Sequence, residues 1–251
     1  TIRLGERYLR PTAGLIGGLL LALTTGLIAS SQQVKEDVPS MFFATLSLYW
    51  IVKFADSGRL RDLLVAAIAG GASAATKAYG MALLPAMAAA VMGRAARPGS
   101  DPRGVRAAFV HLAAAVGCFA IAQFALAPFS FLDPLGREAT FGRIASLFTM
   151  VARMTGVAQF PPAPDEHLGR HGGMLYGFSD YGRILVSDGG MGWVITSFAA
   201  LGLIALLMRR GFAELLLIGY VTLFVVVSVI LYPGYAEPRH QTPVYPVLAA
   251  A

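Results

Sequence analysis

Long apolar runs constrain the fold of this chain more than any other feature of its sequence. They lie at about 11–30, 38–55, 62–76, 78–93, 107–127, 189–208 and 213–232, and an eighth begins near Pro243. Most of them approach the roughly 20 residues that a helix needs to cross the hydrocarbon core of a bilayer. Only 14% of the residues are charged, whereas soluble domains carry about a quarter. The sequence therefore predicts an all-α, polytopic integral membrane helix bundle with about seven or eight spans.

The lysines and arginines divide the loops between these runs into two sets. One set holds twelve of the 20 basic residues: Arg3, Arg7, Arg10, Lys53, Arg59, Arg61, Arg94, Arg97, Arg103, Arg106, Arg209 and Arg210. Because short loops rich in Lys and Arg stay in the cytoplasm, we expect this set on the cytoplasmic face. The stretch SQQVKEDVPS (31–40), Lys77, residues 128–188 and residues 233–242 then share the extracytoplasmic face. Residues 128–188 are predicted to form one long extracytoplasmic loop, and loops of that length are usually functional or disordered.

Charge and cysteine content exclude several other classes of protein. The net charge of +6 does not predict a nucleic-acid partner, because the basic residues lie at the ends of apolar runs and form no continuous stripe. The single cysteine, Cys118, lies within an apolar run and supports neither a disulfide nor a cysteine metal site. The chain begins at Thr1 and stops inside a new apolar run, so we expect it to be an internal piece of a longer protein.

Two adjacent acids on the predicted extracytoplasmic face are the first candidates for chemistry. Glu36 and Asp37 stand directly before the second apolar run. Acidic side chains at the end of a span are costly to bury, so they tend to face a cavity or a partner. Asp37 could instead cap the helix that Val38 and Pro39 begin, since Asp is a strong N-cap and proline is tolerated in the first turn.

Two cations on the same predicted face are candidates for binding an anion. Lys77 separates the third and fourth runs, which are either a tight hairpin or one interrupted span. Its ammonium could pair with a phosphate as a point charge or extend to the membrane interface. Arg239 precedes the last apolar run and could bind a phosphate in bidentate fashion. It could equally hold Glu237 or lipid head groups.

Four stretches of the chain resemble a known family in their order and spacing. They are VKEDVPSMFF (34–43), GGASAATKAYGMALLP (70–85), APFSFLDPLGREATF (127–141) and AEPRHQTPVYPVLAA (236–250). This pattern resembles the C-type (GT-C) glycosyltransferases, in particular bacterial relatives of protein O-mannosyltransferases and aminoarabinose transferases. The chain departs from the family pattern at Ala127, where members carry Asn, and at His240, where they carry an aromatic residue.

The resemblance implies a function, a location and a set of partners. Such enzymes move a sugar from a polyprenyl-phosphate or polyprenyl-pyrophosphate carrier to a hydroxyl of a lipid, glycan or protein acceptor, outside the cytoplasm. The expected location is the bacterial inner (plasma) membrane, with many spans and an extracytoplasmic active site. Residues 1–251 would then be part of one transmembrane domain that contains the 128–188 loop.

The resemblance also assigns roles to individual residues. Asp37, helped by Glu36, is expected to direct the acceptor or a metal. Lys77 and Arg239 are expected to bind the donor phosphate. The family's first extracytoplasmic loop bears its principal catalytic acid, and that loop is expected upstream of Thr1. No cofactor is certain from the sequence, although a divalent metal ion could also stabilise the leaving phosphate.

Two rival functions remain open at the level of sequence. A transporter or flippase without catalysis would place charges near the middle of its spans, often in repeats. Here the acids gather at one predicted face. An O-antigen ligase or polymerase would share the lipid-linked donor and the long loop, and it would depend on the histidines and arginines of that loop: His167, Arg170, His171 and Arg183.

Overall fold

The computed structural model describes residues 11–24, 28, 31, 36–96, 103–132, 182–183, 186, 192–209, 211–231 and 248. Within these ranges every regular element is a helix. The elements are α2 (Pro11–Ala22), α4 (Asp37–Ser57), α5 (Leu60–Thr76), the 3₁₀ helix η1 (Ala78–Ala82), α6 (Leu83–Ala95), α7 (Arg103–Leu126), α8 (Phe129–Leu132), α12 (Gly192–Arg209) and α13 (Phe212–Leu231). The predicted all-α class is therefore confirmed for the described part of the chain.

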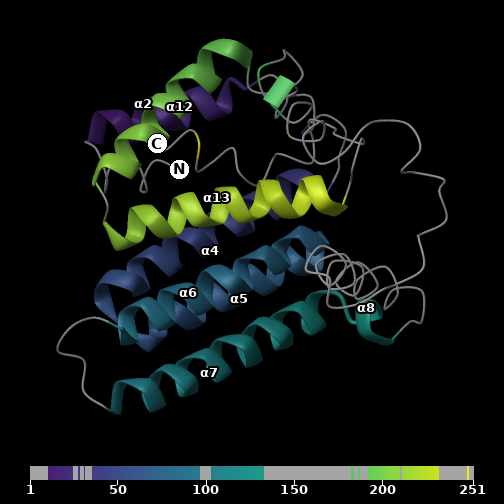
Figure 1. Cartoon of the computed structure of the whole chain (residues 1–251). Helices are drawn as coiled ribbons and strands as arrows, with labels where there is room; N and C mark the ends of the chain where they lie inside the picture. The colour runs from purple at the N-terminus through teal and green to yellow at the C-terminus, as the bar shows by residue number, and fades with distance from the viewer. Residues whose placement is uncertain are drawn as a thin grey trace, which may run out of the picture.

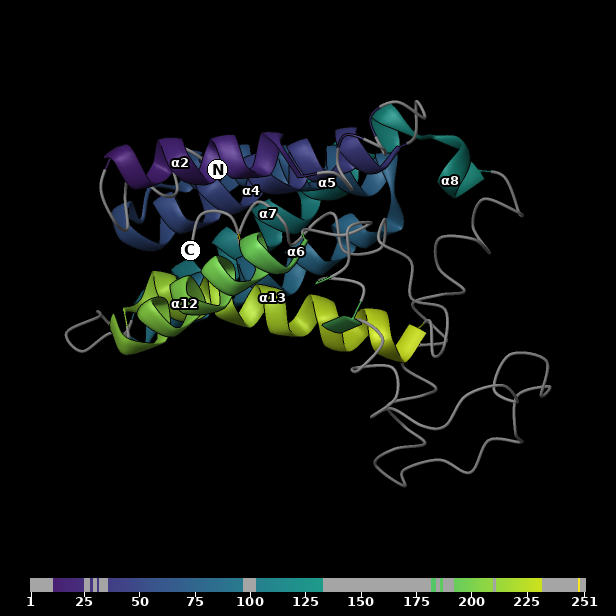
Figure 2. The same cartoon turned by 90° about the horizontal axis from the view of Figure 1, so that it is seen from above.

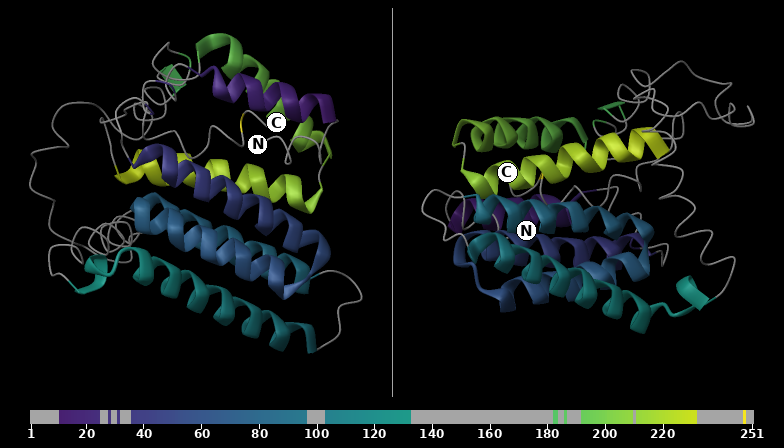
Figure 3. Two further views of the ribbon diagram at one scale, coloured as in Figure 1. Left: turned by 180° about the vertical axis from the view of Figure 1, so that it is seen from behind. Right: turned by 60° about the horizontal axis from the view of Figure 1, so that its bottom comes forward.

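Successive helices α4, α5, α6 and α7 run in opposite directions, α5 and α6 both pack against α4 and α7, and α13 lies alongside α4 and α6 (Figure 1). Figure 2 shows α12 next to α13, on the side of the bundle away from α2. Figure 3 gives the same arrangement from behind and from below. The start of α4, the end of α5, the start of α6 and the end of α7 all lie at one end of the bundle, which we call the Asp37 end. The Gly58 end is the opposite one, where α4 turns into α5.

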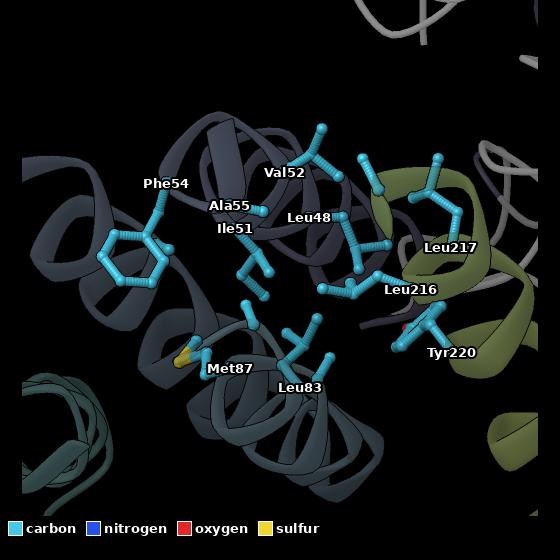
Figure 4. Close-up of a cluster of buried hydrophobic side chains, with 14 of the residues drawn as sticks. Leu48, Ile51, Val52, Phe54, Ala55, Leu83, Met87, Leu216, Leu217 and Tyr220 are labelled. Atoms are coloured by element: carbon cyan, nitrogen blue, oxygen red, sulfur yellow. The ribbon is translucent and has the colours of Figure 1, made fainter. Parts of the chain in front are cut away.

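The buried core involves side chains of α4, α5, α6, α7 and α13, and Figure 4 shows the part of it between α4, α6 and α13. Its labelled side chains are Leu48, Ile51, Val52, Phe54 and Ala55 of α4, Leu83 and Met87 of α6, and Leu216, Leu217 and Tyr220 of α13. All of them are buried. Because lipid tails are as apolar as these side chains, close packing and hydrogen bonds, rather than the hydrophobic effect, hold helices together in a membrane.

Small residues bring α5 close to α7. A methyl group added at Gly71 would lie 2.4 Å from the carbonyl oxygen of Phe119, and one added at Gly70 would lie 3.0 Å from the Phe119 ring. Glycine and alanine at a helix interface allow two backbones to approach closely, which strengthens packing where no hydrophobic drive exists. The glycines of the third apolar run therefore fix the distance between these two helices.

The third and fourth apolar runs form two helices that reverse direction at Lys77. Lys77 is extended, with φ −153° and ψ 133°, and ends α5 before η1 and α6 follow. At the far end of α6, the Arg94 guanidinium donates to the backbone oxygens of Ala55 (3.3 Å) and Asp56 (3.1 Å). The end of α6 therefore returns to the Gly58 end, and the hairpin alternative for these runs is confirmed.

Two described helices are long and apolar enough to cross a membrane, namely Asp37–Ser57 and Arg106–Leu126. Shorter apolar helices lie at Gly80–Ala95, Ile195–Arg209 and Phe212–Val226. The second of the long helices leaves large apolar side chains such as Phe109, Val110 and Ile121 exposed, as a helix facing lipid would. The count of about seven or eight spans stays a prediction, and the eighth run falls almost wholly outside the described residues.

Candidate active site

Asp37 and Lys77, forty residues apart in sequence, meet at the Asp37 end of the bundle. The Lys77 ammonium donates to Oδ1 of Asp37, which makes the two side chains an ion pair. The carboxylate belongs to the first turn of α4, and the lysine is the residue at which α5 ends. The structure thus brings together two of the four residues that the sequence marks as a candidate site.

The backbone at the start of α4 decides between the two interpretations of Asp37. The helix begins at Asp37 itself, and Glu36 is the N-cap residue, without a capping hydrogen bond from its side chain. Asp37 is the first residue of the helix rather than the residue before it, and its carboxylate accepts from Lys77. The alternative in which Asp37 caps the helix is therefore wrong. Glu36 is exposed.

The Asp37 side chain is almost fully buried and only half satisfied. It is 1% exposed. Its second oxygen, Oδ2, is buried and has no hydrogen-bond partner among the described residues. A buried carboxylate oxygen without a donor costs free energy, so it calls for an explanation such as a bound ion, a water molecule or a catalytic role. This oxygen is the one to which a hydroxyl or a cation could bind.

The backbone around Lys77 holds its side chain at a defined place. The Lys77 N–H donates to the Ser73 carbonyl (2.8 Å), and the Lys77 carbonyl accepts from the Gly80 N–H (3.0 Å). Gly80 lies directly on the end of α5, since a methyl group there would come within 2.3 Å of the Ala74 nitrogen. The Lys77 side chain is 15% exposed, so it lies at the edge of the protein rather than in its core.

Two buried serines join α4 to α5 one helical turn from the ion pair. The Ser73 hydroxyl donates to the Ser40 carbonyl (3.0 Å), the two hydroxyls lie 3.2 Å apart, and the Ser40 hydroxyl lies 3.4 Å from the Ser73 carbonyl. We call this pair the serine bridge. Sequence reasoning missed it. The only signal was a serine in each of two apolar runs, and small serines are common in such helices.

A second lysine–aspartate pair at the Gly58 end provides a comparison. Lys53 Nζ lies 3.9 Å from Oδ1 of Asp62, and the lysine also lies over the ring of Trp50. The other Asp62 oxygen accepts a hydrogen bond from the Ser57 hydroxyl (2.6 Å). Both Asp62 oxygens therefore have partners, and this pair ties the α4–α5 turn together. Only at the Asp37 end does a described, buried carboxylate keep an oxygen without a donor.

Other predicted site elements fall outside the described residues. These are Arg239 and all of the 128–188 loop except residues 128–132, 182–183 and 186. Their roles stay predictions. Within the described ranges, no group of three or more His, Cys, Asp or Glu side chains gathers as a metal site.

A comparison with known proteins identifies a family that resembles the first half of the chain. The family model of the dolichyl-phosphate-mannose-protein mannosyltransferases matches residues 2–126. The matched segment contains both members of the ion pair and the whole serine bridge. A search of curated proteins and a search of solved structures each returned no match. The match covers just under half of the chain, and together with the apolar helices it supports placing the chain in the C-type (GT-C) superfamily of membrane glycosyltransferases.

Proposed function

We propose that this chain carries part of the active site of an enzyme that moves a sugar from a polyprenyl-phosphate carrier to an acceptor hydroxyl on the extracytoplasmic face of a bacterial inner membrane. The observation that carries the proposal is the Asp37–Lys77 pair within the segment matched by the family model. Such a transfer needs a carboxylate that can accept a hydrogen bond from the acceptor, and next to it a cation for the phosphate. Asp37 has an oxygen without a partner among the described residues, and Lys77 lies beside it.

The chemistry assigns a separate task to each member of the pair. In the transfer, the bond between the anomeric carbon and the phosphate oxygen breaks, and a bond from that carbon to the acceptor oxygen forms. The acceptor hydroxyl gives its proton to a carboxylate, and the departing phosphate gains negative charge. Oδ2 of Asp37 is the oxygen to which the hydroxyl could donate. Lys77 supplies positive charge to the phosphate, because an ammonium has three donors and can contact a carboxylate and a phosphate at once.

Three further groups complete the proposal. Glu36 stands next to Asp37 and, being exposed, could assist from the aqueous side. Arg239 is proposed as a second ligand of the donor phosphate. The principal acid is proposed to come from a loop upstream of Thr1, so that Asp37 would be the second acid of the site. A divalent metal ion remains a candidate for holding the phosphate, and Oδ2 of Asp37 is the described oxygen that could bind it.

The test is a transfer assay with the full-length protein in vesicles. Polyprenyl-phosphate mannose is the first donor to try, because mannose is the sugar that the family description names. Transfer of labelled sugar to an acceptor, with release of polyprenyl phosphate, is the expected result. Movement of the intact donor across the vesicle membrane without a new glycosidic bond would instead identify a flippase and overturn the proposal. A panel of other lipid-phosphate sugars separates a wrong sugar from a wrong reaction.

Lys77→Gln is expected to raise the KM for the lipid-phosphate donor about 10- to 100-fold, because a hydrogen bond to a charged group contributes about 1.5–3 kcal/mol. It is also expected to lower kcat, because the phosphate gains negative charge as it departs. Steady-state kinetics in the same vesicles measure the effect. Lys53→Gln is the matched control, since it removes a second lysine that is paired with a buried aspartate in the described part of the chain. Lys77→Arg keeps the positive charge and is expected to retain part of the activity. An unchanged KM in both Lys77 variants would remove Lys77 from the phosphate site.

The proposed orientation has its own test. In a variant from which Cys118 and any other native cysteine have been removed, Glu36→Cys introduces an exposed thiol next to Asp37. We expect a membrane-impermeant maleimide to label it in intact spheroplasts, because the Asp37 end is proposed to be extracytoplasmic. A cysteine at exposed Arg59, at the Gly58 end, is the control and should be labelled only after the membrane is opened. The reverse pattern would place the Asp37 end in the cytoplasm.

A further inference from the structure

We propose that the serine bridge is a positioning device for the reaction, which sets the depth of Lys77 relative to Asp37 in the membrane. This inference rests on the proposed function, because it assigns a role in catalysis to residues that touch neither substrate. Ser40 and Ser73 would act through the ion pair, by fixing the axial register of α4 against α5. They are positioning residues rather than catalytic ones.

The geometry connects each serine directly to one member of the ion pair. Ser40 lies three residues after Asp37, and Ser73 lies four residues before Lys77. In an α-helix, residues three or four apart share a face, so the bridge lies on the same face as the pair, one turn deeper. The Ser73 carbonyl is also the acceptor for the Lys77 N–H. Displacement of Ser73 would therefore move the backbone of Lys77 with it.

The bridge resists sliding better than the surrounding contacts do. Ser40 is 1% exposed and Ser73 is fully buried, so water does not compete for their hydrogen bonds. Each hydroxyl approaches the backbone carbonyl of the opposite helix, which makes the contact reciprocal. Apolar contacts between small side chains tolerate a shift along the helix axis. Directional hydrogen bonds do not, because they weaken steeply as the angle departs from linear.

Another buried serine at the same interface separates positioning from ordinary helix packing. Ser47 of α4 is fully buried, and its hydroxyl donates to the Ala66 carbonyl of α5 at 2.8 Å. This hydrogen bond has the same chemistry and joins the same two helices, but it lies about two turns farther from the ion pair. If the serines only hold α4 to α5, loss of Ser47 should be as harmful as loss of the bridge.

The experiment compares Ser73→Ala, Ser40→Ala and the double variant with Ser47→Ala, in the full-length protein in vesicles. We expect the double variant to lower kcat for sugar transfer about 10-fold or more, since a misplacement of about 1 Å can cost on the order of 100-fold in rate. Ser47→Ala is expected to leave kcat within about twofold of the parent. It is expected to lower the thermal midpoint in detergent about as much as Ser73→Ala does, because each substitution removes a buried hydrogen bond. An equal loss of kcat in Ser47→Ala and in the bridge variants, compared at the same loss of thermal midpoint, would overturn the inference.

A second arm asks whether the bridge acts through the ion pair. In a Lys77→Gln background there is no lysine ammonium to position, so loss of Ser73 should have much less effect on kcat than in the parent protein. Groups that act through one another are non-additive in this way, whereas independent sites simply add. The same fold-loss in both backgrounds would show that Ser73 acts independently of Lys77 and would contradict the proposal.

The outcomes distinguish this inference from the proposed function. If Asp37→Asn and Lys77→Gln abolish or impair transfer while the bridge variants behave like Ser47→Ala, only the positioning role fails. If Asp37→Asn and Lys77→Gln leave transfer unchanged, the site itself is misassigned, and the positioning role fails with it.

Discussion

Asp37→Asn is expected to reduce sugar transfer by about 100-fold or more while the protein remains folded. The substitution keeps the shape of the side chain but removes its negative charge and its capacity to accept a proton. An acceptor hydroxyl that Asp37 no longer orients can lose on the order of 100-fold in rate, which is the cost of a misplacement of about 1 Å. The asparagine would also leave the Lys77 ammonium without its carboxylate partner. The measurement is transfer from a polyprenyl-phosphate sugar at saturating donor, with the thermal midpoint recorded for the same preparation.

The chain offers two matched controls for this substitution. Asp62→Asn removes the charge from a second buried aspartate that faces a lysine among the described residues, at the opposite end of the bundle. It should lower the thermal midpoint, because the Ser57 and Lys53 contacts weaken, and leave the rate of transfer nearly unchanged. Glu36→Gln alters the adjacent, exposed acid and is expected to change the rate only a few-fold. Full activity in Asp37→Asn, or an equal loss of activity in Asp62→Asn, would remove Asp37 from the active site.

Gly80→Ala is expected to destabilise the protein by about 3 kcal/mol and to abolish transfer, because overpacking against backbone costs on the order of 1–3 kcal/mol or more. The added methyl group would lie 2.3 Å from the Ala74 nitrogen and 2.6 Å from the Ser73 carbonyl carbon. Both are main-chain atoms, so no side chain can rotate away to make room. The end of α5 would have to move, and Lys77 and the serine bridge would move with it. Thermal unfolding in detergent and the transfer assay measure the two consequences.

Gly219→Ala is the matched control for this steric argument. Gly219 lies within α13, and a methyl group added there would meet no heavy atom within 4 Å. Alanine favours the helix over glycine by roughly 1 kcal/mol, so the thermal midpoint should stay the same or rise. A Gly80→Ala variant that keeps both its thermal midpoint and its activity would show that the close contact of Gly80 with α5 is not required.

The main helices in the described part of the chain could be predicted to within about five residues at each end. The run expected at 38–55 is α4 (Asp37–Ser57), and the run expected at 107–127 is α7 (Arg103–Leu126). The agreement has a simple cause, because an apolar segment in lipid can satisfy its backbone groups only within its own helix. The one ambiguity, at Lys77, concerned a reversal between two short runs, which depends on the contact between α6 and the Gly58 end rather than on local composition.

The candidate site could be predicted only as a set of separate residues. Asp37 and Lys77 stood out because charge is rare in apolar surroundings, but nothing in either stretch indicated that they form an ion pair. The neighbouring residues, Val38 and Pro39, were equally compatible with Asp37 as a helix N-cap. The serine bridge could not be predicted, since serine is a common small residue at helix interfaces and its partner lies 33 residues away.

The amino-acid sequence by itself determined the class of this protein, the lengths of its main helices and the residues that carry charge into an apolar bundle. Those properties depend on composition and on the length of each run, and neither needs a neighbouring helix. Only the tertiary structure decided that Asp37 faces Lys77, that one oxygen of Asp37 lacks a donor, and that Ser40 meets Ser73. These contacts depend on the rotation and axial register of α4 against α5. Small side chains present nearly the same surface on several faces of each helix, so the sequence of α4 and α5 does not by itself specify that register.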